Sequence, residues 1–195
     1  MKDPILRDIR EHITVMEAIA ADQDLRAGIR QAADLILSAF RNGGRLYLFG
    51  CGGSAADAQH IAAEFVNKMH RMRAALPAVA LTTDNSVLTA IGNDDSFDHV
   101  FSRQVEAFAG KDDIVVGIST SGTSPSVVNG LRAGRERGAE TVLLTGGRGD
   151  EPGDAAGLVI RVPSASTPRI QEAHIAIAHI ICTIVEEEAF YAGRR

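Results

Sequence analysis

A glycine-rich segment contains the first residues whose types and spacing point to ligand binding. It reads LFGCGGSAADAQHIAAEF over residues 48–65, where a short apolar run breaks at Gly50 and a helical pattern follows. Residues 50–55 match G-x-G-x-x-G/A, the pattern of a dinucleotide-binding turn. The acidic partner expected about 20 positions later does not fit well, because Asp84 lies 34 positions after Gly50. A dinucleotide, a sugar phosphate and a simple tight turn all remain open here.

A second segment, STSGTSPS at residues 119–126, also lies between an apolar run and a helical pattern. Ser124 is a suitable N-cap and Pro125 a suitable first helical residue. Capping needs one hydroxyl, whereas residues 119–124 supply five. Because a helix N-terminus offers free N–H groups and a positive dipole end, this loop favours a phosphate monoester held without Lys or Arg. A Ser/Thr-rich turn with a single cap is the plainer alternative.

Titratable and amide side chains gather on two predicted helices. His60 and Glu64 are four positions apart, so they share a face and can meet at one proton or one metal ion, although such pairs are often surface ion pairs. His179 lies among isoleucines, which predicts partial burial and also suits a hydrogen-bonded core histidine. Gln171 lies eight residues before it, about 12 Å along a helix. The two could reach one atom across a subunit boundary, or if Gln171 precedes the regular helix.

The scaffold that must position these residues is predicted from the order of apolar patterns. Two N-terminal helices cover residues 4–40, with a break at 22–24. Strands are expected at 45–50, 77–83, 113–120, 140–145 and 158–162, and helices at 54–72, 86–92, 97–109, 125–137 and 168–191. Mostly apolar strands that alternate with helices predict an α/β fold with a doubly wound, five-stranded parallel sheet of flavodoxin-like topology. Ligands bind such sheets beyond the carboxyl ends of the strands, which here are residues 50–54, 83–84, 119–124 and 145–146.

Length and composition set the limits on class and location. The 195 residues suit one domain over 1–195, with helices at 1–42 used in oligomer packing and an α/β core at 45–191; residues 146–157 read as a surface loop. A net charge of -5 argues against nucleic acid. The longest apolar stretch, 175–185, is too short to span a bilayer, and the N-terminus lacks a signal-peptide pattern. Cys51 and Cys182 are expected to be reduced thiols in a cytoplasmic protein.

Taken together, GCGGSAADAQH and STSGTSPS resemble the sugar isomerase (SIS) domain, a fold that binds phosphosugars with such a Ser/Thr loop. With LTTDNSVLTAIGND, FSRQVEA and RIQEAHI in the same order, the chain is similar to the phosphoheptose isomerase family. That resemblance implies interconversion of sedoheptulose 7-phosphate and D-glycero-D-manno-heptose 7-phosphate, the first step of ADP-heptose synthesis for lipopolysaccharide or another heptose conjugate. It also implies one zinc ion per subunit, no nucleotide cofactor, and a homotetramer with interfacial active sites.

The resemblance assigns roles to particular residues. Glu64 would be the base that moves a proton between C1 and C2 through an enediol, with His179 as its partner. The implied zinc ligands are His60, Glu64, Gln171 and His179. The implied substrate contacts are Cys51, Gly52, Gly53, Ser54, Glu64, Asn93, Asp94, Ser119, Thr120, Ser121, Ser124 and Gln171. From sequence alone, Asn93 and Asp94 read more simply as a helix end and turn.

Two positions depart from the family pattern, and one other class of protein competes. Cys51 stands where the family usually has Asn, and Lys68 where many members have Arg; both put the substrate in doubt more than the reaction. A thiol at a helix N-terminus can also become reactive. The competing class is a non-catalytic tetrameric binding protein similar to the DnaA initiator-associating protein, which is not expected to keep Glu64 and His179. A phosphosugar-sensing regulator would need a DNA-binding domain, and 44 residues precede the first predicted strand.

Overall fold

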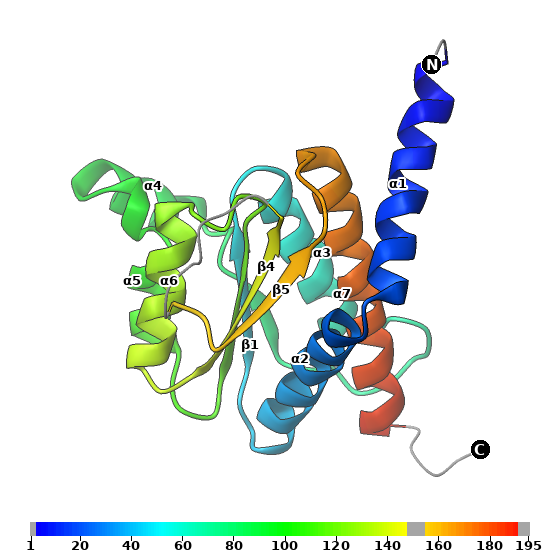
Figure 1. Ribbon diagram of the computed structural model, residues 1–195. Helices are drawn as coiled ribbons and strands as arrows, with labels where there is room; N and C mark the ends of the chain where they lie inside the picture. The colour runs from blue at the N-terminus through cyan, green and yellow to red at the C-terminus, as the bar shows by residue number, and fades with distance from the viewer. Residues whose placement is uncertain (1–2, 148–154, 191–195) are drawn as a thin grey trace.

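The computed structural model describes residues 3–147 and 155–190, and its centre is a parallel sheet of five strands (Figure 1). The strand order is β2-β1-β3-β4-β5, which is the flavodoxin-like arrangement predicted from the sequence. The strands are β1 Leu46–Gly50, β2 Ala78–Ala80, β3 Ile114–Ile118, β4 Glu140–Gly146 and β5 Leu158–Val162. Every residue of β1 and β3 is buried, because helices cover both faces of the sheet.

Each face of the sheet forms its own hydrophobic core. On one face α2 (Gln23–Arg41), α3 (Gly53–Val66) and α7 (Thr167–Phe190) pack against alternate strand residues such as Leu48 and Val116. On the other face α5 (Ser102–Phe108) and α6 (Pro125–Glu136) pack against the intervening residues, such as Phe49 and Val115. This division of the helices between two faces is the predicted doubly wound architecture, and it places α3 beside α7.

Two further helices lie at the margins of the fold. The N-terminal helix α1 (Pro4–Ala21) ends at Asp22, whose side chain caps α2, so the predicted break at residues 22–24 is confirmed. Its first half extends beyond the sheet and helices (Figure 1). Helix α4 (Asn85–Asp94) follows β2, leads into a 3-10 turn at Phe97–His99 and contains no buried residue.

Some predicted boundaries were wrong. The helix predicted at 54–72 ends at Val66, because the backbone N–H groups of the following loop bond to a glutamate of α7 instead of continuing the helix. The helix predicted at 97–109 is divided into the 3-10 turn and α5. The strand predicted at 77–83 has three residues in the sheet. Most of the predicted loop at 146–157, and residue 191 of the last helix, lie outside the described residues. Within the described parts of the chain, no helix combines the length and apolar character needed to span a bilayer.

Candidate active site

The two segments singled out in the sequence meet in one pocket at the carboxyl end of the sheet. The glycine segment leaves β1 and the hydroxyl-rich segment leaves β3, and these strands are paired neighbours. Both segments and α7 contribute to the lining, which includes Cys51, Ser54, Ser119, Thr120, Ser121, Ser124 and Gln171. No Lys or Arg belongs to this lining among the described residues. The pocket therefore offers hydroxyl, thiol and amide groups without a compensating side-chain charge.

Two helix N-termini at this pocket lack side-chain caps. Gly52 and Ser124 occupy the N-cap positions of α3 and α6, and neither helix has a side-chain cap hydrogen bond, whereas aspartates cap α1, α2 and α4. Ser124 stands at the predicted N-cap position, but its hydroxyl lies 3.3 Å from the Ser126 hydroxyl instead of capping the helix. The N–H groups of Ser54, Ala55 and Val127 bond to carbonyls of the preceding turn, and Pro125 has no N–H. Gly53 of α3 and Ser126 of α6 have N–H groups without an acceptor among the described residues, and an anion is the acceptor that a helix N-terminus favours.

Glycines of the two pocket segments allow tight turns and, at Gly53, the close approach of a side chain from α7. Gly52 and Gly122 have φ values of 60° and 73°, a backbone conformation that residues other than glycine rarely adopt. The Gly122 N–H donates to the Ser119 carbonyl at 3.1 Å and to its hydroxyl at 3.2 Å, closing the hydroxyl-rich loop. A Cβ atom on Gly53 would lie 2.5 Å from the amide nitrogen of Gln171. Gln171 therefore packs directly on the start of α3.

The unusual Cys51 lies in this pocket and is partly buried. Its Sγ atom is 3.4 Å from the hydroxyl of Ser126, which is itself buried near the start of α6. The thiol therefore joins the glycine segment to α6 at the rim of the pocket.

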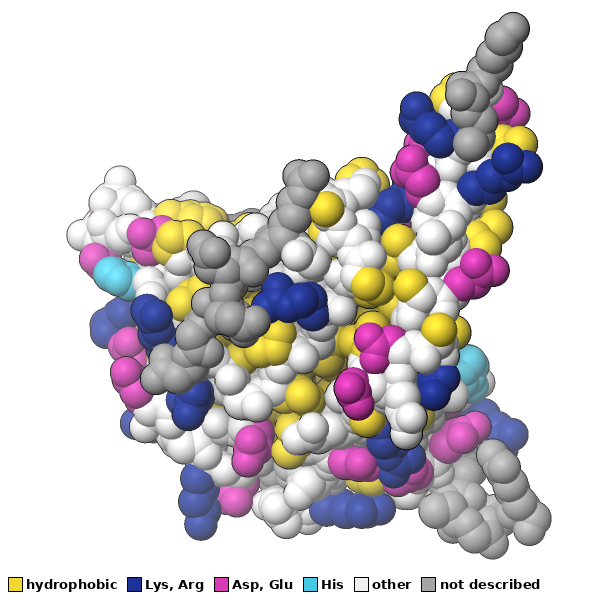
Figure 2. All heavy atoms as spheres, viewed as in Figure 1, with side chains coloured by type: hydrophobic (Ala, Val, Ile, Leu, Met, Phe, Trp, Pro, Cys, Tyr) yellow, Lys and Arg dark blue, Asp and Glu magenta, His cyan; other side chains and the backbone are white. Residues whose placement is uncertain are grey.

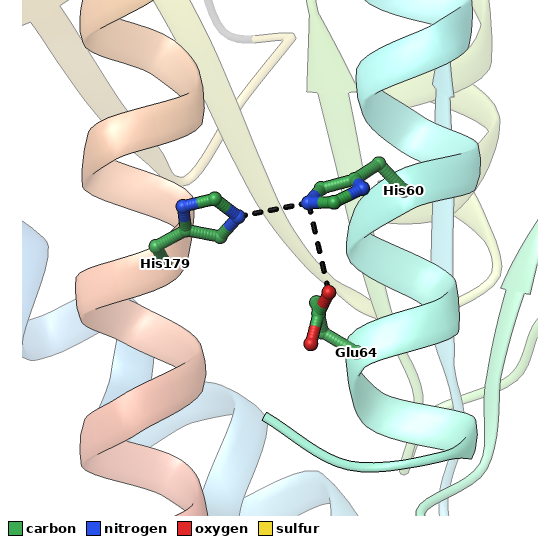
Figure 3. A group of neighbouring side chains, drawn as sticks. All are labelled: His60, Glu64 and His179. Carbon is green, nitrogen blue, oxygen red and sulfur yellow. Dashed lines mark hydrogen bonds and ion pairs between the residues drawn. The ribbon is translucent and has the colours of Figure 1, made fainter. Parts of the chain in front are cut away.

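A cluster of titratable side chains lies between α3 and α7. His60 and Glu64 extend from α3 towards His179 of α7 (Figure 3). The Nε2 atoms of the two histidines are 2.9 Å apart, and His60 Nε2 is 3.6 Å from a Glu64 carboxylate oxygen. Half of the His60 side chain and about a fifth of the Glu64 side chain are exposed (50% and 21%). The cluster is therefore accessible from solvent.

The cluster has the composition of a metal site. Each of the three residues offers one ligand atom, and these atoms all lie within 4.8 Å of one another. Two imidazole nitrogens and one carboxylate oxygen are a ligand set that zinc accepts, with a fourth position left for another group. Two facing imidazoles and a carboxylate can also exchange protons directly, because one Nε2 atom must donate to the other. The residues present thus fit both acid–base chemistry and a zinc ion.

The pocket and the cluster are connected by the same two helices. His60 lies seven residues after Gly53, about 10 Å along α3, and His179 lies eight residues after Gln171, about 12 Å along α7. The pocket and the cluster are thus about two helical turns apart along both helices.

The structure does not bring all the predicted site residues together. Gln171 lines the pocket, and α7 begins at Thr167, so the option that Gln171 precedes the regular helix is wrong. Asn93 and Asp94 are exposed at the end of α4, where the Asn93 amide donates to the Asp94 carboxylate at 2.7 Å. Neither of them is part of the pocket lining.

Sequence reasoning missed the residues that hold the cluster in place. Buried Glu186 of α7 accepts the N–H groups of Met69, His70 and Arg71 and pairs with Arg73 at 3.1 Å. Burial would raise the pKa of Glu186, but these four donors outweigh it and hold the pKa below its ordinary value. Arg73 also donates to the backbone carbonyl of Glu64 at 2.8 Å. The sequence feature that could have revealed this role is the position of Glu186, which continues the helical spacing of the apolar residues of the last helix.

Two further groups adjoin the cluster. Burial, with a smaller effect from Glu64, raises the pKa of Cys182 to about 12, so this thiol stays protonated. Burial also raises the pKa of Asp57, one turn before His60, while His60 opposes the shift. One carboxylate oxygen of Asp57 is buried and has no hydrogen-bond partner among the described residues.

Fold and site together define a class of phosphosugar-binding α/β protein, and the sequence profile of the SIS domain matches residues 9–146. Within that class, a phosphoheptose isomerase of Geobacter sp. strain M21 is 51% identical over 99% of this chain and 100% of its own length. One of Aneurinibacillus thermoaerophilus is 48% identical over 97% and 96%. The solved phosphoheptose isomerase of Francisella tularensis superposes with a TM-score of 0.89 at 33% identity, covering 94% of this chain and 96% of that one. This chain belongs to the SIS domain family and, within it, to the phosphoheptose isomerases, as its motifs predicted.

Proposed function

We propose that this protein is an aldose–ketose isomerase that interconverts sedoheptulose 7-phosphate and D-glycero-D-manno-heptose 7-phosphate. One observation carries the proposal. A pocket at two uncapped helix N-termini and a His–Glu–His cluster lie two helical turns apart along both α3 and α7. This spacing suits a substrate with a phosphate at one end and a reacting carbonyl at the other. Relatives about 50% identical over the whole chain carry the isomerase name.

The phosphate would be bound by main-chain N–H groups at the starts of α3 and α6 and by surrounding hydroxyls. The hydroxyl donors are Ser54, Ser119, Thr120, Ser121 and Ser124, and the backbone at Gly52 and Gly53 completes this side of the pocket. Cys51 lies where it can contact a sugar hydroxyl or leave that contact to water.

Glu64 would act as the base of the reaction. Its carboxylate takes the proton from one carbon of the C1–C2 pair and returns it to the other. His179 exchanges a proton with the adjoining oxygens, and His60 lies within 2.9 Å of it to orient its ring. The electrons of the broken C–H bond move into the C1–C2 bond and back, so the isomerisation needs no oxidant and no nucleotide cofactor.

Zinc is part of the proposal. His60, Glu64 and His179 would hold it, and Gln171 of a second subunit would supply the fourth ligand, because eight residues of α7 separate Gln171 and His179 within one subunit. When bound, zinc would supply Lewis-acid polarisation of an oxygen, and it would replace the hydrogen bond between the two Nε2 atoms, because a ring nitrogen that binds a metal cannot also take part in that bond. The exposure of His60 suits a site completed by another subunit.

A homotetramer with interfacial active sites is the oligomer that we propose. The projecting half of α1 exposes Ile5, Leu6, Ile9 and Ile13, and Figure 2 shows hydrophobic side chains along this helix. Asn93 and Asp94, on a helix without buried residues, would contact substrate from a neighbouring subunit. A cytoplasmic location accords with the free Cys51 and Cys182. Light scattering of the purified protein tests the tetramer, and a monomer would refute it.

The alternative of a non-catalytic tetrameric binding protein is not favoured, because Glu64 and His179 are both present and lie in one cluster. The decisive experiment is turnover of sedoheptulose 7-phosphate by wild type and Glu64→Gln, with and without added zinc. We expect wild-type turnover and a loss of about 10³-fold in the variant. A wild type that is inactive under both conditions would refute the proposed substrate, and Cys51→Asn would then test whether the departure at position 51 is the cause.

A further inference from the structure

Two buried polar side chains lie behind the hydroxyl-rich loop and have no part in the mechanism described above. Thr145 belongs to the carboxyl end of β4 and is fully buried. His174 lies on α7 one turn after Gln171, and 1% of it is exposed. Residues three apart on a helix share a face, so His174 lies on the side of α7 that carries Gln171 to the pocket.

The polar atoms of both side chains are poorly paired. The Thr145 hydroxyl is buried without a partner among the described residues. The His174 ring faces the backbone of Thr145, but its nitrogens make no hydrogen bond of good geometry within the described parts of the chain. Burial lowers the pKa of His174 to about 4, and the backbone of Thr145 opposes part of this shift. The ring is therefore a neutral imidazole at neutral pH, with one N–H donor and one acceptor beside Thr145. Buried polar atoms are paired in nearly all native structures, so the unpaired Thr145 hydroxyl and the poorly paired His174 ring indicate a role.

Thr145 directly supports the hydroxyl-rich loop. Its Oγ1 atom lies 2.7 Å from the position that a Cβ atom would occupy on Gly122, so the hydroxyl fills the space under the loop's left-handed residue. The next residue, Gly146, donates its N–H to the Thr120 carbonyl at 3.1 Å. At the other end of the loop, the Ser119 N–H donates to the Leu144 carbonyl at 3.0 Å. The end of β4 thus fixes the loop at three successive residues.

We propose that Thr145 and His174 are positioning residues that hold the hydroxyl-rich loop in its phosphate-binding conformation. This inference rests on the proposed function, in which the loop binds the phosphate of a sugar. The Thr145 hydroxyl can turn its O–H towards a dianion held on the other side of the loop, while the His174 ring supports the Thr145 backbone. The hydroxyl dipole acts strongly there because the surroundings are buried and have a low effective dielectric constant. The pair therefore determines phosphate affinity and leaves the proton transfers at the distant cluster unchanged.

Thr145→Val tests the proposal, because valine keeps the shape of threonine and removes the hydroxyl. Replacing an unpaired buried hydroxyl by a methyl group should leave the melting temperature unchanged or raise it. We expect KM for the sugar phosphate and the Kd for inorganic phosphate to rise about fivefold, with kcat within twofold. Thr145→Ser, which restores the hydroxyl, should return both constants to near wild type. A purely structural threonine would not produce weaker phosphate binding together with an undiminished melting temperature.

Thr141→Val is the matched control on the same strand. Thr141 is also buried, but its hydroxyl accepts the Gly157 N–H at 2.9 Å and lies at the opposite end of β4 from the loop. This variant should lower the melting temperature and leave the Kd for phosphate unchanged. The two threonines are therefore expected to show opposite patterns.

Calorimetric titration with inorganic phosphate separates this inference from the proposed substrate. If wild type binds phosphate but does not turn over sedoheptulose 7-phosphate, the substrate is wrong and the loss of phosphate affinity in Thr145→Val still supports the positioning role. If Thr145→Val and His174→Gln both bind phosphate as tightly as wild type, the inference is overturned whatever the enzyme turns over.

Discussion

Two glutamates on the paired helices α3 and α7 have the same side chain and opposite surroundings. Glu186 is buried, and its carboxylate accepts three backbone N–H groups and the Arg73 guanidinium. Glu64 is partly exposed, and its carboxylate lies 3.6 Å from His60 Nε2. The first carboxylate is enclosed by fixed donors, whereas the second faces two imidazoles and solvent.

The difference indicates that one glutamate stabilises the fold and that the other is available for the proposed reaction. Donors around Glu186 stabilise its charged form, which suits a permanent structural anion. Glu64 lies in the open cluster, where the proposed function requires it to transfer a proton or bind a metal ion. The two are also linked, because Arg73 pairs with Glu186 and donates to the Glu64 carbonyl. The enclosed glutamate therefore helps to fix the end of the helix from which the open one acts.

The largest expected effect separates the two glutamates by activity. Glu64→Gln should lower kcat about 10³-fold, because the amide cannot serve as a general base. Its melting temperature should stay close to that of wild type, since the substitution keeps the shape of a partly exposed side chain. Glu186→Gln, assayed below its melting temperature, should keep kcat within about tenfold of wild type. Equal losses of kcat in the two variants would show that the two glutamates do not differ in their contribution to catalysis.

The next largest effect separates them by stability. Glu186→Gln should lower the free energy of unfolding by about 3 kcal/mol at pH 7, because it leaves the buried Arg73 without its counter-charge. The pKa of Glu186 is lowered in the folded protein, so its contribution is present above the ordinary value of 4.5 and is lost as pH falls through the folded value. Urea unfolding of wild type and variant should therefore converge below about pH 4.5. A constant difference down to lower pH would show that the charge of Glu186 is not responsible.

A smaller effect concerns metal binding. Zinc that binds the folded protein alone, at 100 times its Kd, should stabilise wild type by about 2.7 kcal/mol. Glu186→Gln should show a similar increase from its lower baseline, whereas Glu64→Gln and His60→Gln should show much less. Thermal unfolding with and without zinc measures this. A full zinc effect in both cluster variants would place the metal elsewhere.

The fold could be predicted from sequence because its signals are local. Apolar runs such as residues 114–118, each followed by a loop and a helical pattern, define the parallel sheet, and Asp22 marks the break between the first two helices. The two pocket segments were also found, because ligands bind beyond the carboxyl ends of such strands. The family resemblance added the roles of Glu64 and His179, which spacing alone left open.

What could not be predicted depends on contacts between distant residues. The end of α3 at Val66 is determined by Glu186, 120 residues later, which captures the backbone of the loop that follows. Thr145 belongs to none of the motifs, and His174 lies in RIQEAHI without an assigned role; their position behind the loop follows from the packing of β4 against α7. The place of Gln171 in the pocket also depends on that packing.

The uncapped N-termini of α3 and α6 have a consequence for how such a protein can change during evolution. Every residue except proline has a main-chain N–H group, so under the proposed function a phosphate held by such groups would survive most substitutions in the surrounding loop. Side chains such as Cys51 are then free to vary and to alter which sugar is accepted. A site of this kind would keep binding the phosphate of its substrate while substitutions change which sugar it accepts.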